Sequence, residues 1–159
     1  MNRSPVRTGS TSVFKLAWLV PLTVSLNSCS YIASFYVCNA SGADIIVSYS
    51  RRYEHGYNRL FSDSPTLHAF DAKRNSIGDE MPIGAIERAG LTRVTVTIPA
   101  GAALRTGREV NPWMCVPECF ADLDRLLIIL SGDTTVLPST TLHSFLIELD
   151  GQDRGIVIR

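Results

Sequence analysis

Two cysteines separated by three residues form the most specific chemical pattern in this chain. Cys115 and Cys119 stand in the run Cys-Val-Pro-Glu-Cys, a spacing found in zinc-binding cysteine pairs. No second pair of cysteines or histidines occurs at a matching spacing, so such a metal site would lack half of its ligands. In an oxidising compartment a disulfide is the stronger expectation. Cys115 can pair with Cys119, or Cys38 can pair with either of them and leave one thiol free.

The other residue types that perform catalysis show no recognisable arrangement. The chain contains no G-x-S-x-G elbow, no H-E-x-x-H motif and no phosphate-binding glycine loop. A catalytic triad can still assemble in space, because triads are defined by geometry and not by order. The three histidines are scattered, at His55, His68 and His143. We therefore expect a non-catalytic protein without metal or cofactor, with a small envelope hydrolase as the alternative.

Aromatic residues beside arginines predict a binding surface. Tyrosine, tryptophan and arginine are the residue types enriched at binding hot spots. One such group surrounds His55, and Trp113 stands just before Cys115. If these segments share one end of the fold, they form a surface for a partner; otherwise the aromatic rings pack under their own loops. The candidate binding residues are Tyr53, Tyr57, Arg59 and Trp113.

The charge of the chain is unevenly distributed. The 159 residues carry 15 basic and 15 acidic side chains. Arg3, Arg7 and Lys15 are the only charged residues among the first 28, and removing them leaves 12 basic against 15 acidic residues. A weakly acidic remainder lacks the basic footprint of a nucleic-acid-binding protein. The 45% hydrophobic content indicates a globular chain, and the length favours one domain.

The first 28 residues have the organisation of an export signal. A polar segment with only positive charges precedes the apolar run Leu16–Leu26. As a helix this run would span about 16 Å, whereas a bilayer core is about 30 Å thick. The run therefore has the length of a signal-peptide core rather than of a membrane span. An ordinary cleaved signal and a short uncleaved anchor are the alternatives.

The end of the apolar run resembles the lipobox of bacterial lipoproteins. Leu26-Asn27-Ser28-Cys29 has the aliphatic residue, the small residue and the cysteine of that motif, while Asn27 is larger than usual. The resemblance implies that Cys29 receives the lipid and becomes the new N-terminus. Because Ser30 is not aspartate, it also implies transfer to the outer membrane, with the protein facing the periplasm. The expected organisation is a lipoprotein signal peptide over residues 1–28 and one β-rich periplasmic domain over residues 29–159.

Alternating apolar residues predict short strands throughout the expected domain. Residues 31–38 and 45–49 alternate across turn residues and are expected to pair as a hairpin, with Val37 opposite Ile45. Residues 93–98 alternate most clearly, and residues 102–106 are expected to return beside them.

The second half of the domain continues this pattern. Residues 126–130 form an apolar run typical of a central strand, and a turn leads from them into residues 134–137. Residues 145–149 are expected to form a hairpin with residues 156–158, with Ile147 opposite Ile156.

The expected fold is a small antiparallel β-sandwich or partly open barrel of about eight strands with one short helix. The short helix is placed over residues 117–124 by Pro117 and Glu118 at its start. A further helical turn is expected around residues 83–88.

The opening strands are similar to those of periplasmic lipoprotein inhibitors of C-type lysozyme. The similarity lies in the pattern Phe35-x-x-Cys38-x-x-x-Gly42-x-x-Ile45-x-Val47-x-Tyr49. The inhibitory segment S-x-S-G-x-R-Y of that family is absent, so no site residue carries over. The leading hypothesis is a lipid-anchored, non-catalytic module that binds an envelope protein or a cell-wall component. A lysozyme inhibitor is the alternative that this resemblance implies.

Overall fold

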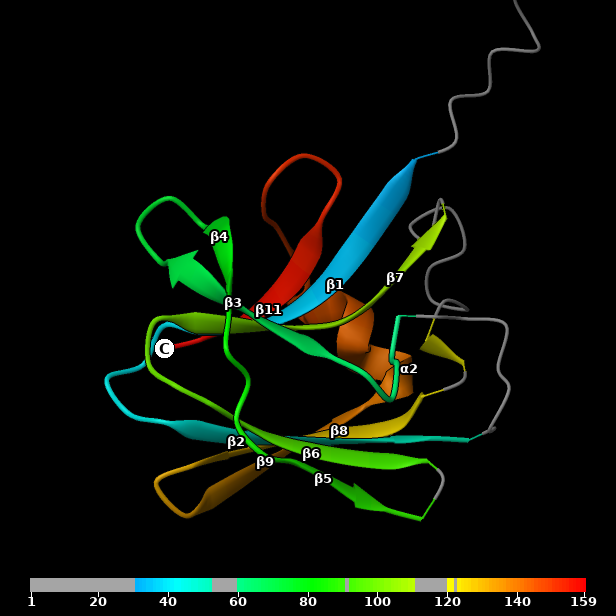
Figure 1. The fold of residues 1–159 in the computed structure, drawn as a ribbon. Coiled ribbons are helices and arrows are strands. Elements are labelled where there is room, and N and C mark those ends of the chain that lie inside the picture. The colour runs from blue at the N-terminus through cyan, green and yellow to red at the C-terminus, as the bar shows by residue number, and fades with distance from the viewer. Residues whose placement is uncertain (1–30, 53–59, 91, 111–119, 122) are drawn as a thin grey trace, which may run out of the picture. The chain divides into compact units, whose positions relative to one another are not determined.

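Two β-sheets lie face to face and enclose an apolar core (Figure 1). The computed structural model describes residues 31–52, 60–90, 92–110, 120–121 and 123–159. One sheet has the strand order β10-β11-β1-β7-β3-β4, and the other has the order β5-β6-β2-β8-β9. The elements are β1 (Ile32–Asn39), β2 (Ile45–Arg51), β3 (Thr66–Asp71), β4 (Ser76–Met81), β5 (Ile86–Ala89), β6 (Arg93–Ile98), β7 (Ala102–Val110), β8 (Leu123–Leu130), β9 (Asp133–Pro138), α2 (Ser139–Leu142), η3 (His143–Phe145), β10 (Ile147–Glu148) and β11 (Arg154–Ile158).

The chain is therefore a β-sandwich, as its sequence predicts, and its sheets do not close into a barrel. The helix expected around residues 83–88 is wrong, because Ile86–Ala89 form strand β5. The helix expected over residues 117–124 is also wrong at its end, where Leu123 and Asp124 already belong to β8. Within the described residues the short α-helix is α2, which buries Leu142 in the core.

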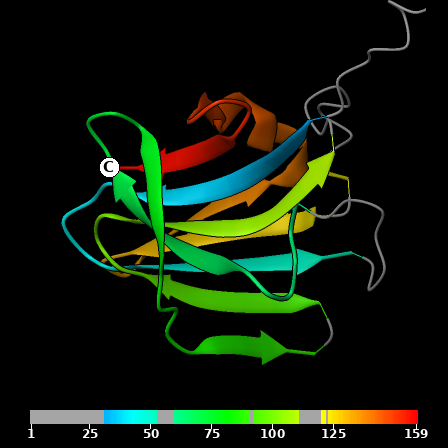
Figure 2. The same cartoon turned by 45° about the horizontal axis from the view of Figure 1, so that its top comes forward.

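The expected hairpin between residues 31–38 and 45–49 does not form. β1 pairs with β7 and β11 in one sheet, whereas β2 pairs with β6 and β8 in the other. The turn is where the sequence places it, but it carries the chain from one sheet to the facing one (Figure 2, blue β1 above cyan β2). Val37 and Ile45 still share the core, but they meet it from opposite sheets. The alternation of apolar residues is the same for both connections, so it cannot distinguish them.

A second crossing of the same kind connects β6 to β7. The expected pairing of residues 102–106 with residues 93–98 is wrong, because β7 pairs with β1 and β3. Pro99, Ala100 and Gly101 carry the chain across between the sheets, and Gly101 has a φ of +72°, which glycine adopts without strain. We call these two connections the arches: residues 39–45 and residues 98–102.

The buried side chain of Asn39 links the two arches. Its Nδ2 donates to the carbonyl oxygen of Ala43 at 2.8 Å and to that of Ile98 at 3.0 Å. Its Oδ1 accepts from the backbone N–H and the hydroxyl of Ser41, at 3.0 and 2.6 Å. The Asn39 carbonyl oxygen also accepts from the N–H of Gly101 at 3.0 Å. This amide uses both donors and both acceptor positions, so it is buried without an unmet hydrogen bond.

The final hairpin forms with a register one residue away from the expected one. Ile147 lies opposite Gly155 rather than Ile156, and the strands are joined through a bond from the Leu149 N–H to the Asp153 carbonyl oxygen at 3.1 Å. A Cβ on Gly155 would lie 2.8 Å from the Leu149 side chain and 2.9 Å from the Tyr36 carbonyl oxygen. The absence of a side chain at Gly155 therefore lets Leu149 cover the strand, and this contact sets the register.

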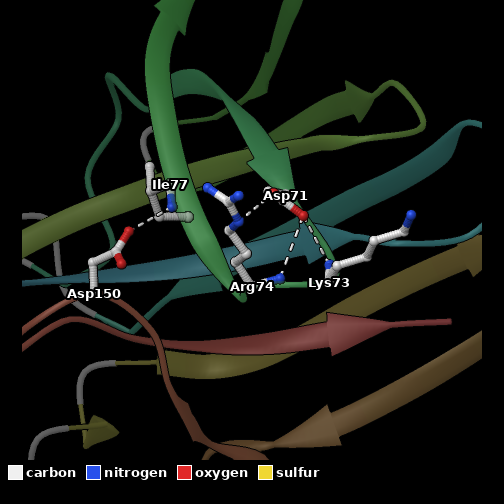
Figure 3. Close-up of polar contacts among 5 residues, drawn as sticks. All are labelled: Asp71, Lys73, Arg74, Ile77 and Asp150. Carbon is white, nitrogen blue, oxygen red and sulfur yellow. Dashed lines mark hydrogen bonds and ion pairs between the residues drawn. The ribbon is translucent and has the colours of Figure 1, made fainter.

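The two edges of the β1-containing sheet meet over its outer face. The backbone N–H of Ile77 on β4 donates to the Asp150 carboxylate, in the loop after β10, at 2.7 Å (Figure 3). Beneath them lies a second apolar cluster, whose buried members are Tyr36, Cys38, Phe70, Ala103 and Leu149. In the neighbouring turn, Asp71 accepts from the backbone N–H groups of Lys73 and Arg74, at 2.9 and 3.3 Å (Figure 3).

The apolar run at residues 126–130 and the turn after it are confirmed. The run belongs to β8, which pairs on both sides, with β2 and β9. Ser131 and Gly132 have φ values of +53° and +92°, as the two-residue hairpin turn between twisted strands requires. Both apolar clusters lie within Tyr31–Arg159, which forms one compact unit. This unit therefore contains the core that it needs to fold.

The arches give the first testable prediction. Asn39→Ala should lower the free energy of unfolding by about 3 kcal/mol, because it removes the side-chain link between the arches and leaves the buried Ile98 carbonyl oxygen without this donor. Asn39→Asp keeps the shape but loses both donors, so it should also destabilise the fold. Urea unfolding measures both effects. Thr97→Ala, an exposed position on the neighbouring β6, should change stability by no more than about 0.5 kcal/mol. Equal stability of Asn39→Ala and wild type would contradict this role of Asn39.

Candidate functional site

Four arginines line one pocket at an end of the β2-containing sheet. The pocket has a volume of about 410 Å³. Arg51 and Arg52 come from the end of β2, Arg93 from the start of β6, and Arg125 from the start of β8. The other lining residues are Ser50, Ala89, Thr92 and Asp124.

Strand register brings the arginines together. Ser50 lies opposite Arg93 on one side and opposite Arg125 on the other, so all three side chains project from the outer face of the sheet. Neighbouring strands are about 4.8 Å apart, which places the two arginine backbones about 10 Å apart with the small serine between them. The Arg93 Nε donates to the Ser50 hydroxyl at 3.4 Å. The small serine side chain therefore lies between two arginine side chains.

One carboxylate accompanies the four arginines among the described residues that line the pocket. Asp124 is the single carboxylate among the described lining residues, and its oxygen lies 3.7 Å from the Arg125 Nε, with the two side chains about half exposed. An ion pair this exposed contributes little. Glu87 on β5 lies opposite Thr95, one repeat along the sheet from Arg93, and does not line the pocket. Like charges that line one pocket repel one another, and an arriving anion relieves that repulsion. Guanidinium groups bind phosphate and carboxylate through paired hydrogen bonds.

The arginine pocket lies at the end of the sandwich where β1 begins. β1 runs toward the arches and β2 runs back from them, so Ile32 and Arg51 lie at the end opposite the arches (Figures 1 and 2). Ile32 pairs with Val110 at this end, and the two side chains are 63% and 51% exposed. Exposed apolar side chains thus occur at the same end of the sandwich as the arginine pocket.

The predicted binding residues Tyr53, Tyr57, Arg59 and Trp113 lie outside the described residues, so the predicted surface stays a prediction. Leu60 and Phe120, the described residues that follow the two segments that contain them, are both buried in the apolar core.

Cys38 is a free, fully buried thiol in the outer cluster of the β1-containing sheet. Burial raises its pKa to about 12. Its predicted disulfide partners, Cys115 and Cys119, lie outside the described residues, as does the predicted lipidation site Cys29. Their pairing and modification therefore stay predictions.

The two described histidines, His68 and His143, lie on β3 and on η3. The His68 ring is buried, where its Nε2 shares a hydrogen bond with the Thr66 hydroxyl at 3.0 Å and its Nδ1 faces the Gly78 carbonyl oxygen at 3.4 Å. It packs edge-on against Tyr36, with ring centroids 5.8 Å apart. His143 is exposed on η3, and His55 lies outside the described residues. Among the described residues, no three histidine, cysteine or acidic side chains gather as metal ligands.

A second pocket, of about 440 Å³, opens between the two sheets. It lies between β9 of one sheet and β11 of the other, and Phe145 at its rim is 48% exposed. Its floor is apolar, formed by Ile128, Leu130, Leu137, Ile156 and Ile158. No local pattern in the sequence indicates this pocket, because its walls come from distant strands.

Comparisons with known proteins identify no relative. No family model, curated protein or solved structure matches the chain. The resemblances to lipoprotein signals and to lysozyme inhibitors therefore stay hypotheses drawn from the sequence. Within the described residues, no helix has the length and apolar character needed to span a membrane.

The arginine pocket was not predicted from the sequence. Arg52 stands beside the tyrosines in the sequence, whereas Arg93 is only the polar side of an alternating strand. Arg125 precedes an apolar run and carries no signal of its own. If the pairing of β6 and β8 with β2 were known, these three arginines would be expected at one end of the sheet. The alternation of apolar residues, however, does not determine which strands pair.

Burial of Cys38 gives a second testable prediction. Because its pKa is raised to about 12, the reactive thiolate is scarce at pH 8. Iodoacetamide should therefore leave Cys38 unmodified in the native protein and modify it after unfolding without a reductant. Peptide mass spectrometry measures both states. If Cys38 of the unfolded, unreduced protein stays unmodified, it is in a disulfide, and the free-thiol assignment is wrong.

Proposed function

We propose that this chain is a lipid-anchored envelope protein whose β-sandwich is a non-catalytic module that binds an anionic component of the cell envelope. The observation that carries the binding role is the arginine pocket, which is lined by four arginines and one aspartate. Proteins use arginine clusters of this kind to hold phosphate or carboxylate groups. The pocket contrasts with the rest of the molecule, since the chain beyond residue 28 carries more acidic than basic residues.

The lipid anchor is supported by the sequence of the first 29 residues. The apolar run is too short to span a bilayer, and Cys29 stands where a lipobox places the acylated cysteine. Two or more acyl chains would hold the protein firmly, because each buried methylene contributes about 0.8 kcal/mol. In this proposal the protein lies on the outer membrane and faces the periplasm.

The anchor and the binding site would lie at the same end of the sandwich. Cys29 precedes Ile32 by three residues, which bridge at most about 10 Å when extended. The start of β1 lies at the end that carries the arginine pocket. A lipid on Cys29 would therefore hold this end of the domain close to the membrane surface.

Lipidation of Cys29 is the third testable prediction. In cells grown with labelled palmitate, the wild-type protein should incorporate label and Cys29→Ser should not, because the sulfur that receives the lipid is gone. Cys119→Ser provides the matched control and should keep the label. Gel autoradiography of the immunoprecipitated proteins measures the incorporation. Label retained by Cys29→Ser would refute the proposed anchor.

A further inference from the structure

We propose that the arginine pocket binds the phosphate groups of anionic phospholipids in the membrane to which the chain is anchored. This inference rests on the proposed function, because the lipid on Cys29 is what holds the pocket at the surface. It adds a second membrane contact, made by the folded domain itself. The domain would then have a fixed orientation on the bilayer instead of moving freely on its tether.

The position of the pocket favours a lipid headgroup over other phosphates. The pocket opens at the end of the β2-containing sheet, at the same end of the sandwich as the start of β1 in the facing sheet. A tether of about 10 Å on β1 would hold that end of the sandwich near the headgroup phosphates. Basic residues near an anionic membrane surface each contribute about 1 kcal/mol to binding.

The exposed apolar residues at this end agree with a bilayer surface. Ile32 and Val110 pair with each other and are 63% and 51% exposed. Apolar side chains beside arginines are the composition of segments that lie in the membrane interface, where the apolar part enters the boundary of the acyl chains and the charges stay with the headgroups. A soluble phosphate compound would use the arginines but would leave Ile32 and Val110 in water.

The opposite end of the sandwich supplies a matched control. The turn between β3 and β4 carries Lys73 and Arg74, and it lies at the arch end because the N–H of Phe70 donates to the Gly101 carbonyl oxygen at 2.9 Å. The Arg74 side chain is 82% exposed and pairs only loosely with Asp71, at 3.7 Å. Removing these two charges changes the net charge by the same amount as removing two arginines from the pocket.

The fourth prediction is tested with residues 30–159, which contain both apolar clusters and lack the lipid that would itself bind vesicles. This protein should float with vesicles that contain phosphatidylglycerol but not with pure phosphatidylcholine vesicles, and added salt should weaken binding. The double variant Arg93→Gln, Arg125→Gln should bind about 25-fold more weakly, about fivefold for each arginine. Lys73→Gln, Arg74→Gln should bind as wild type does. Thermal unfolding checks that each variant is folded.

Three outcomes would overturn the inference. Equal losses in the two double variants would show that only net charge matters. Equal binding to both kinds of vesicle would show that the pocket does not recognise an anionic headgroup. Binding of inorganic phosphate that depends on Arg93 and Arg125, without vesicle binding, would make the pocket a site for a soluble anion. The palmitate experiment on Cys29 has its own readout, so failure of the anchor and failure of the pocket are distinguishable.

Discussion

A single buried amide links two of the connections that cross between the sheets, and these two connections place β1 and β2, and β6 and β7, in different sheets. Asn39 ends β1, and its side chain bonds within its own arch and to Ile98 in the other. Its backbone carbonyl oxygen accepts from Gly101 as well. A buried amide with all its partners contributes modest stability, but one left without partners is costly. The interaction therefore favours crossing over hairpin formation at both places, which keeps β1 and β2, and β6 and β7, in different sheets.

The arches also determine where the arginines of the pocket come together. Because β2 leaves the first arch and runs back to the other end, its last residues reach the end of the sandwich where β1 starts. β6 and β8 flank β2, so their first residues reach the same end, and Arg93 and Arg125 meet across Ser50. Had β1 and β2 paired as a hairpin, β2 would lie in the other sheet and this pocket would not exist. The proposed membrane contact is thus a consequence of topology more than of any local motif.

The positions of many strands follow from local patterns in the sequence. The pairing and register of the strands depend on contacts between distant residues, which local patterns do not show. Alternation located β1, β2 and β6, and a continuous apolar run located β8; the sandwich class followed from the number and spacing of the expected strands. The turn after β8 followed from Ser131, Gly132 and Asp133. Pairing failed at both arches, because a hairpin and a crossing present the same alternation to the core. The register of the last hairpin failed by one residue, because it depends on Leu149 covering Gly155.

The candidate site shows the same division. Residue types alone predict binding by Tyr53, Tyr57, Arg59 and Trp113, and these residues lie outside the described part of the chain. The arginines that line the pocket come from three strands far apart in sequence, and only their pairing with β2 unites them. The spacing of residues in a sequence predicts sites that lie within one strand, helix or loop. This site instead forms because strand pairing brings distant residues together.

The most direct test of the account is to ask which end of the anchored protein touches lipid. A photo-crosslinking amino acid placed at Ala89, an exposed position in the arginine pocket, or at Ala100, an exposed position in the second arch, reports contact within the envelope. The account predicts phospholipid adducts from position 89 and none from position 100, detected by mass spectrometry of the full-length processed protein. Adducts from position 100 alone, or equally from both positions, would contradict it.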